Sequence, residues 1–248
     1  PAPLAKVRYM LTLLAVFALP FLGLGQKEDF QVLVAVGCSA PRSVQNDYRE
    51  MLNQEVLPRL SERLLNTSIR LTLAPITGRS YTAPIKVIET PDALATPRFK
   101  LEKFKKTFHQ QALEAFDQLR KRAIAECTKG TEIVAALKAA GERARGPGKI
   151  LLLVHGFEQS SLTNLYDYRL KLERPQVRQE ILERARKQLG LPQLRDQEVC
   201  FAGLTAGNDR NANARLTSSI RLFWQELVEA SGGKLAGYGA SPRICTFW

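Results

Sequence analysis

Short apolar runs alternate along the chain with longer segments in which apolar residues recur every three or four positions. The short runs are rich in β-branched residues and end near Gly, Pro or polar residues, which predicts strands. The predicted strands are 31–36, 69–74, 85–89, 149–154, 198–204 and the closing segment 243–248. The periodic segments predict helices at 44–65, 98–127, 131–145, 176–189 and 216–230. This alternation predicts an α/β fold: a single, mostly parallel, doubly wound sheet with helices on both faces.

The predicted strands differ in their expected places in the sheet. KILLLV at 149–154 is the most hydrophobic strand of the predicted domain and is expected at the centre of the sheet. The strand 85–89 lies between Pro84 and Pro91 and is expected at an edge. Pro75 is expected to end the strand 69–74.

The first 25 residues predict export. Lys6 and Arg8 precede an uncharged run over residues 10–24 that ends in small residues. This order is typical of a secretory signal peptide, and an uncleaved N-terminal membrane anchor is the alternative. We therefore expect a leader at 1–25 and one α/β domain at 26–248. The protein is expected in the periplasm, outside the cell, or anchored to the membrane.

The chain is basic, with 36 Lys+Arg against 24 Asp+Glu and a net charge of +12. Such a charge favours acidic partners, and an anionic membrane surface is one candidate. The stretch 98–122 carries many of the cations, but acids are interleaved and no aromatic stacking pattern accompanies them. We interpret it as a solvated helix face, so nucleic acid is not the favoured partner.

Four cysteines allow three disulfide pairings in an oxidising compartment. Cys38 and Cys127 both fall in loops expected at one edge of the sheet, and a disulfide between them is favoured over a soft-metal site that adds His155. Cys200 lies inside an apolar run and is expected as a small buried thiol.

Three loops that follow strands or open a helix are expected at the carboxyl edge of the sheet, at 37–43, 129–133 and 155–161. In order and spacing they resemble the von Willebrand factor type A family, over roughly residues 30–248. The resemblance implies a divalent-cation site built from Asp-x-Ser-x-Ser, a later threonine and an aspartate after the central strand. Here Gly37 and His155 stand where the family has aspartates.

Only Ser39, Thr131 and His155 remain at the cation-binding positions implied by the resemblance. Because magnesium requires carboxylate and hydroxyl oxygens, the site is expected to be degenerate, with no cofactor and weak or absent magnesium binding. The favoured function is a non-enzymatic binding module that recognises a protein or an envelope component. Its candidate contact residues are Ser39, Arg42, Thr131, His155, Glu158 and Ser160.

An α/β-hydrolase is the alternative enzyme class, because KILLLVHGF resembles that family's oxyanion segment and GCSAP its nucleophile turn. The nucleophile would be Ser39 or Cys38. Chain order argues against it, because both precede the HG segment and no histidine follows His155. A third class is a basic-surface binder of anionic lipid or nucleic acid.

Overall fold

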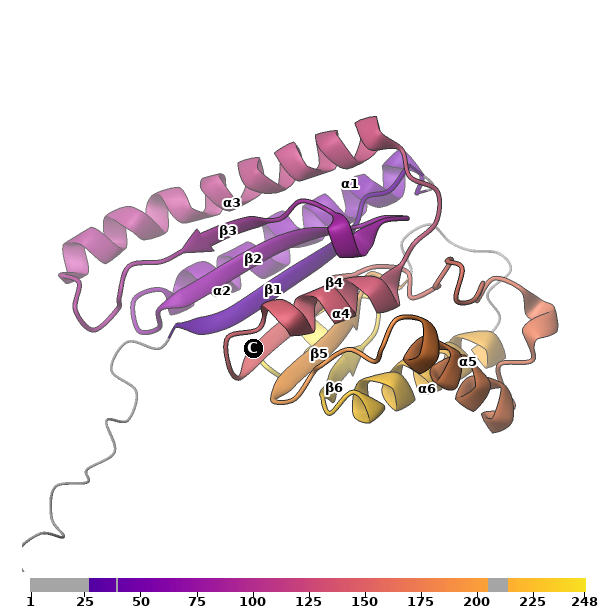
Figure 1. The fold of residues 1–248 in the computed structure, drawn as a ribbon. Helices are drawn as coiled ribbons and strands as arrows, with labels where there is room; N and C mark the ends of the chain where they lie inside the picture. Colours follow the sequence, from indigo (N-terminus) through magenta and orange to yellow (C-terminus); the bar gives the residue numbers. More distant parts are fainter. Residues whose placement is uncertain (1–26, 39, 205–213) are drawn as a thin grey trace, which may run out of the picture.

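The computed structural model describes residues 27–38, 40–204 and 214–248 (Figure 1). Six strands form one sheet in the order β3-β2-β1-β4-β5-β6. They are β1 (Glu28–Ala35), β2 (Ile69–Ile76), β3 (Lys86–Glu89), β4 (Gly148–Leu153), β5 (Gln197–Ala202) and β6 (Lys234–Tyr238). All pairings are parallel except that of β3 with β2. This order is that of a doubly wound α/β sheet, so the predicted fold class is confirmed.

Helices cover both faces of the sheet. They are α1 (Arg42–Met51), α2 (Leu57–Arg63), α3 (Arg98–Glu126), α4 (Ile133–Arg143), α5 (Pro175–Gln188) and α6 (Ala214–Ala230). A π-helical turn, Leu52–Val56, joins α1 to α2. Figure 1 shows α1 and α2 behind the sheet and α4 in front of it. Arg49 of α1 binds Asp117 of α3, and Arg178 of α5 binds Glu226 of α6, so neighbouring helices are linked on each side.

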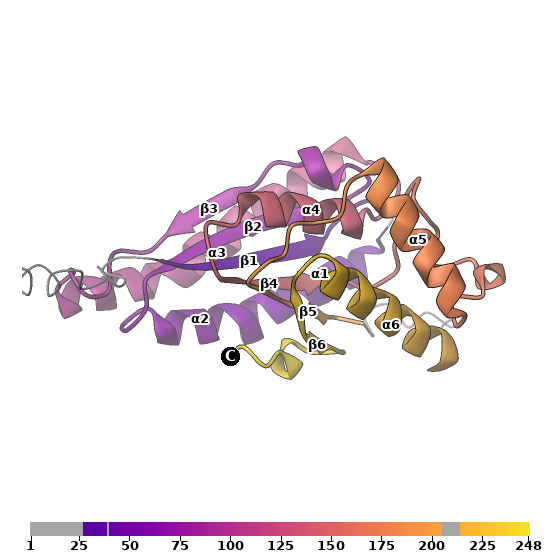
Figure 2. The ribbon, with the colours of Figure 1, turned by 60° about the horizontal axis from the view of Figure 1, so that its bottom comes forward.

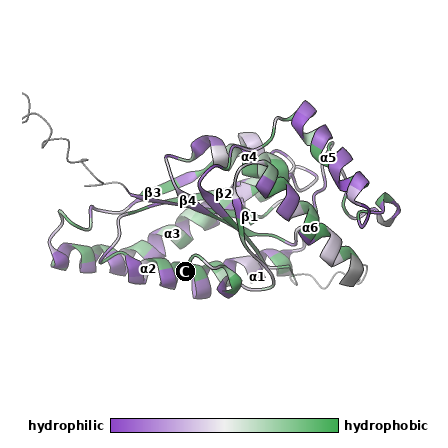
Figure 3. Cartoon of the chain, turned by 90° about the horizontal axis from the view of Figure 1, so that it is seen from below, coloured by the Kyte–Doolittle hydropathy of each residue, from purple (hydrophilic) through white to green (hydrophobic). Residues whose placement is uncertain are grey.

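The core lies around the central strands β1 and β4. Phe30 and Val32 to Val36 are buried, as are Ile150 to Val154, because each strand is paired on both sides and covered on both faces. Trp224 of α6 is fully buried and packs against Phe201 of β5. Figure 3 shows hydrophobic and hydrophilic residues alternating along α2 and α3, as expected for helices with one face on a core.

The prediction that Pro75 ends the second strand is wrong, since β2 continues to Ile76. On its outer side, β2 pairs with β3 only from Arg70 to Leu73. Pro75 therefore lies beyond the paired part of that side, where a missing N–H removes no bond to β3.

The prediction of a closing strand at 243–248 is also wrong. The last strand is β6, and a 3₁₀ turn, Pro242–Ile244, follows it. A disulfide joins Cys245 to Cys200 of β5, which corrects the expectation of a free thiol at Cys200. Figure 2 shows the C-terminal segment running back towards α2, where Arg59 lies over the ring of Trp248.

Within the described residues, no helix is both long and apolar enough to cross a membrane. The leader predicted at residues 1–25 lies outside this part of the chain. Two further 3₁₀ turns, Ser80–Thr82 and Tyr168–Leu170, belong to loops at the carboxyl edge of the sheet.

Candidate functional site

Three segments meet at the carboxyl edge because β1, β2 and β4 are parallel and end together. They are the loop after β2, the connection from α3 to α4, and the loop after β4; we call residues 77–79, 128–132 and 155–166 the loop surface. A disulfide joins Cys127, at the end of α3, to Cys38, which follows β1. The predicted pairing is present. It consumes both thiols, so the soft-metal site and the Cys38 nucleophile are wrong.

Hydrogen bonds donated by main-chain amides connect the three segments. Thr131 and Gln159 exchange two bonds, with N–O distances of 2.9 and 3.0 Å. The amide of Glu132 donates to the carbonyl oxygen of Thr77 at 2.9 Å, and the amide of Gly78 donates to Oγ1 of Thr128 at 3.1 Å. Each segment is thus fixed by its neighbours rather than by its own turns alone.

Two glycines permit this close packing. A Cβ atom on Gly78 would lie 1.8 Å from the carbonyl oxygen of Lys129. Gly130 has φ +100°, and a Cβ atom there would lie 2.6 Å from the carbonyl oxygen of Gln159. Only a residue without a side chain fits at either position, because these contacts are with main-chain atoms.

Glu158 fixes the loop after β4 to the start of α4. Its side chain is buried, and Oε2 accepts hydrogen bonds from the amides of Ile133 (2.6 Å) and Val134 (3.1 Å). These amides begin α4 and have no partner within the helix. Burial raises the pKa of the carboxyl group to about 7, although these bonds and one with Ser160 act in the opposite direction.

This geometry changes the expected role of Glu158. The sequence indicates an exposed contact residue, whereas the structure directs the carboxyl group into the protein, because the loop turns back over α4. The carboxyl group shapes the loop surface and presents no side chain on it.

His155 belongs to a small aromatic cluster. Its Nδ1 accepts a hydrogen bond from the amide of Phe157 at 3.0 Å, and its Nε2 lies 3.2 Å from the hydroxyl of Tyr166. With Nδ1 as acceptor, Nε2 carries the hydrogen and donates to the tyrosine oxygen. The rings of Phe157 and Tyr166 stack with centroids 4.5 Å apart.

The remaining predicted contact residues have different surroundings. Arg42 begins α1 and is exposed. Thr131 is buried, and Ser160 is half-buried with Oγ accepting from the amide of Leu162. Ser39 lies outside the described residues.

Sequence reasoning missed several exposed side chains at this edge: Arg79, Lys129, Asn164 and Tyr166, with Gln159 beside them. Arg79 follows β2, and that loop was not among the three predicted ones. The signal was present, because a second parallel strand must end at the same edge as the first.

The described residues at this edge do not fit a magnesium ion. In that part of the chain, no group of three or more His, Cys, Asp and Glu side chains could hold a metal. The carboxyl group of Glu158 already accepts two amides, and both ring nitrogens of His155 have partners. The degeneracy of the cation site as a whole stays a prediction, since it includes Ser39.

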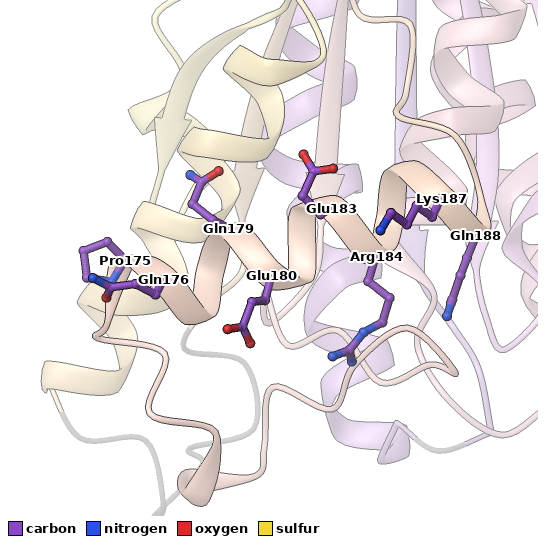
Figure 4. A pocket seen from close by; sticks show the side chains of 8 residues that line it. All are labelled: Pro175, Gln176, Gln179, Glu180, Glu183, Arg184, Lys187 and Gln188. Carbon is purple, nitrogen blue, oxygen red and sulfur yellow. The ribbon is translucent and has the colours of Figure 1, made fainter.

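A hollow of about 730 Å³ lies along α5, beside the loop after β4 (Figure 4). Its lining side chains all come from that helix: Pro175, Gln176, Gln179, Glu180, Glu183, Arg184, Lys187 and Gln188. Arg184 also donates to the carbonyl oxygen of Leu162, so it supports the loop. We interpret the hollow as a solvated groove, because its lining comes from one face of a polar helix.

No protein-family model matches the chain, and no curated protein matches it. The solved structures that match the chain include the following two. The pilus adhesin SpaC from Lactobacillus rhamnosus GG, in its open conformation, has a TM-score of 0.46 and 12% identity over 87% of this chain. A von Willebrand factor type A protein from Catenulispora acidiphila has a TM-score of 0.37 and 10% identity over 85% of it.

The chain spans 28% of the length of the adhesin chain and 38% of that of the second protein. At this level of similarity, the two matches concern the general course of the chain. Both TM-scores lie below 0.5, so neither family nor function is transferred from these matches.

Proposed function

We propose that residues 26–248 form a binding module that recognises a protein or an envelope component through the loop surface, without magnesium. The observation that carries the proposal is the linking of three loop segments by the Thr131–Gln159 and Glu132–Thr77 bonds, while the Glu158 cap and the Cys38–Cys127 disulfide fix the adjoining ends of α4 and α3. Loops held in one conformation before binding lose little entropy when a partner arrives. The carboxyl edge of the sheet is therefore suited to binding a partner.

The exposed side chains on and beside this edge favour an acidic partner. Arg42, Arg79 and Lys129 are exposed cations, and Gln159 and Tyr166 add an amide and an aromatic ring. Positive groups around a mixed polar and aromatic surface steer acidic partners and fix their orientation.

The predicted contact residues enter the proposal in two roles. Arg42, His155 and Ser160 are proposed to reach the partner, as is Ser39. Thr131 and Glu158 are proposed to hold the surface in shape, because both side chains are buried.

An exported location agrees with the two disulfides, since such bonds persist in oxidising compartments. We propose that residues 1–25 direct this export, as a cleaved signal or as a retained anchor. A partner would then be met outside the cytoplasm.

Site-specific photo-cross-linking in the native host tests the proposal. A photoreactive residue at Gln159, on the loop surface, is compared with one at Gln179, an equally polar and exposed position on α5. We expect a discrete adduct from position 159 and none from 179. We also expect the adduct to survive a chelator of divalent cations.

Charge reversal then identifies the surface. Arg79→Glu with Lys129→Glu is expected to abolish the adduct, whereas Lys187→Glu with Arg195→Glu, exposed cations elsewhere, leaves it intact. Equal adducts from both photoreactive positions would contradict the proposal. Loss of the adduct on chelation would show that recognition depends on a metal.

A further inference from the structure

We propose that the opposite end of the molecule docks on an anionic lipid bilayer, through residues 94–106, which we call the α3 tip. The inference does not depend on the proposed function of the loop surface. It rests on where the N-terminal chain leaves the domain, on two exposed apolar side chains and on the cations around them.

The α3 tip lies beside the start of the described domain. Nζ of Lys27, just before β1, lies 2.8 Å from Oε2 of Glu89, the last residue of β3. The chain then runs from Glu89 through residues 90–97 into α3. The residues that precede Lys27 include the uncharged run 10–24. An apolar segment of this chain therefore joins the domain next to the α3 tip.

Leu94 and Phe99 are the two most exposed large apolar side chains among the described residues, at 76% and 70%. Leu94 precedes α3, and Phe99 lies two residues before the buried Leu101, which places it on the opposite face of the first helical turn. The 29 residues of α3 span about 44 Å at 1.5 Å per residue, whereas the 8 residues of β1 span about 26 Å. Figure 1 shows the first turns of α3 extending past the start of β1.

Cations surround these apolar side chains. Arg98, Lys100, Lys103, Lys105 and Lys106 lie within two and a half turns, with Glu102 as the one acid among residues 98–106. The side chain of Arg98 is 78% exposed. Apolar side chains that project between cations are typical of helices at the surface of an anionic bilayer.

This arrangement distinguishes the tip from the rest of α3. The far end of the helix also carries exposed cations, Lys121 and Arg122, but it lies near the Cys38–Cys127 disulfide and the loop surface. A general attraction of the basic helix to anions would involve both ends. Bilayer docking by an apolar wedge involves only the tip, and it would turn the loop surface away from the membrane.

The first test measures contact with acyl chains. The full chain carrying Phe99→Trp is reconstituted with phosphatidylglycerol–phosphatidylcholine vesicles that contain lipids with a nitroxide on the acyl chain. Leu222→Trp is the control, because Leu222 is 45% exposed on α6, which packs beside the opposite edge strand. The unsubstituted chain corrects for Trp224 and Trp248. We expect strong quenching of the residue introduced at 99 and none at 222.

The second test changes charge within the Phe99→Trp chain. Each cation near an anionic surface contributes about 1 kcal/mol, so Lys100→Glu with Lys103→Glu should lower the ratio of docked to undocked domain at least about 30-fold. Lys121→Glu with Arg122→Glu makes the same change of charge at the far end and should leave quenching unchanged.

Three results would overturn the proposal. They are no quenching at position 99 on anionic vesicles, equal quenching at positions 99 and 222, and equal loss in the two charge variants. Sedimentation that shows self-association through the tip in lipid-free solution would also overturn it, because the apolar pair would then meet a second copy. None of these results bears on the photo-cross-link from Gln159.

Discussion

At the scale of single residues, the loop surface depends on the buried carboxyl group of Glu158. It accepts the first two amides of α4 while the main chain of the same residue accepts the amide of Leu165. Glu158 therefore fixes both the start of α4 and the far end of its own loop. Its neighbours Gln159, Ser160 and Ser161 are polar, so the sequence indicates only a polar loop and not the direction of the one side chain that turns inward.

The raised pKa of Glu158 makes a prediction about stability. Its ordinary value is 4.5, and burial raises it to about 7, so between these pH values the folded protein holds a proton that the unfolded chain has released. The stabilisation from this group is complete below pH 4.5 and is lost as pH rises through 7. Relative to Glu158→Gln, the free energy of unfolding should fall by about 3 kcal/mol between pH 4 and pH 8.

Urea denaturation at a series of pH values measures this difference. Glu158→Gln keeps an oxygen that accepts the α4 amides, so the variant should fold. Glu180→Gln, on the exposed face of α5, is the control and should follow the unsubstituted protein. Parallel curves for the Glu158→Gln variant and the unsubstituted protein would show that Glu158 is not the buried, protonated group described above.

At the scale of elements, strong periodicity was enough to place most of the fold. The helix expected at 98–127 is α3 (Arg98–Glu126), and the apolar run KILLLV forms β4 at the centre of the sheet. Both predictions succeed because buried positions carry apolar side chains, and the spacing of these side chains is visible in the sequence. The strand β6 gave no such signal, because KLAGY is short, only partly buried and contains Gly237.

Packing explains why the C-terminal segment was assigned wrongly. RICTFW is apolar like a strand, but only Cys245 and Phe247 are buried against other elements, with Phe247 edge-on to Phe30, while Ile244 is exposed. A Cβ atom on Gly237 would lie 2.7 Å from Sγ of Cys200 and 3.0 Å from the carbonyl oxygen of Ile244, so the glycine makes room for this segment. Sequence alone does not separate a buried strand from a buried irregular segment.

The Cys200–Cys245 disulfide makes a prediction at this scale. It closes a separation of 45 residues, for which chain entropy gives about 4 kcal/mol of stabilisation. Cys200→Ala with Cys245→Ala should therefore lower the free energy of unfolding by about 2–4 kcal/mol. It should also shift the emission of Trp248 to longer wavelength, as the C-terminal segment loosens. Urea denaturation followed by tryptophan fluorescence measures both effects.

Alkylation of the denatured, unreduced protein gives the direct check on the cysteines. Mass spectrometry should find no alkylated thiol, since the structure pairs all four cysteines. Modification at Cys200 or Cys245 would restore the interpretation of Cys200 as a free buried thiol.

At the scale of the whole molecule, the fold gives the protein two different ends. The loop surface lies at the carboxyl ends of the parallel strands, and the α3 tip lies at their amino ends. The first could be located from sequence, because strand order and parallel pairing bring loops together whatever their side chains. The second could not, because the sequence does not show which face of the first turns of α3 is left uncovered, and Phe99 lies on that face.

The candidate site likewise has features that could be predicted from the sequence and features that could not. The loops containing Thr131 and His155 were placed correctly, and the Cys38–Cys127 pairing was among the expected ones. The inward turn of Glu158 and the contribution of Arg79 were missed. Both depend on contacts between segments far apart in the sequence, which no local pattern records.

The central claim is that the loop surface is a single rigid unit before any partner binds, and native-state hydrogen exchange followed by NMR tests it most directly. The amides of Thr131, Glu132 and Gln159 donate the bonds that join its segments, and the amide of Ile133 donates to the carboxyl group of Glu158. We predict opening free energies for these amides within about 2 kcal/mol of the value for the amide of Val154, which bonds to the end of β5. Exchange at the rate of unprotected loop amides would contradict the claim, and with it the proposal of a pre-organised binding surface.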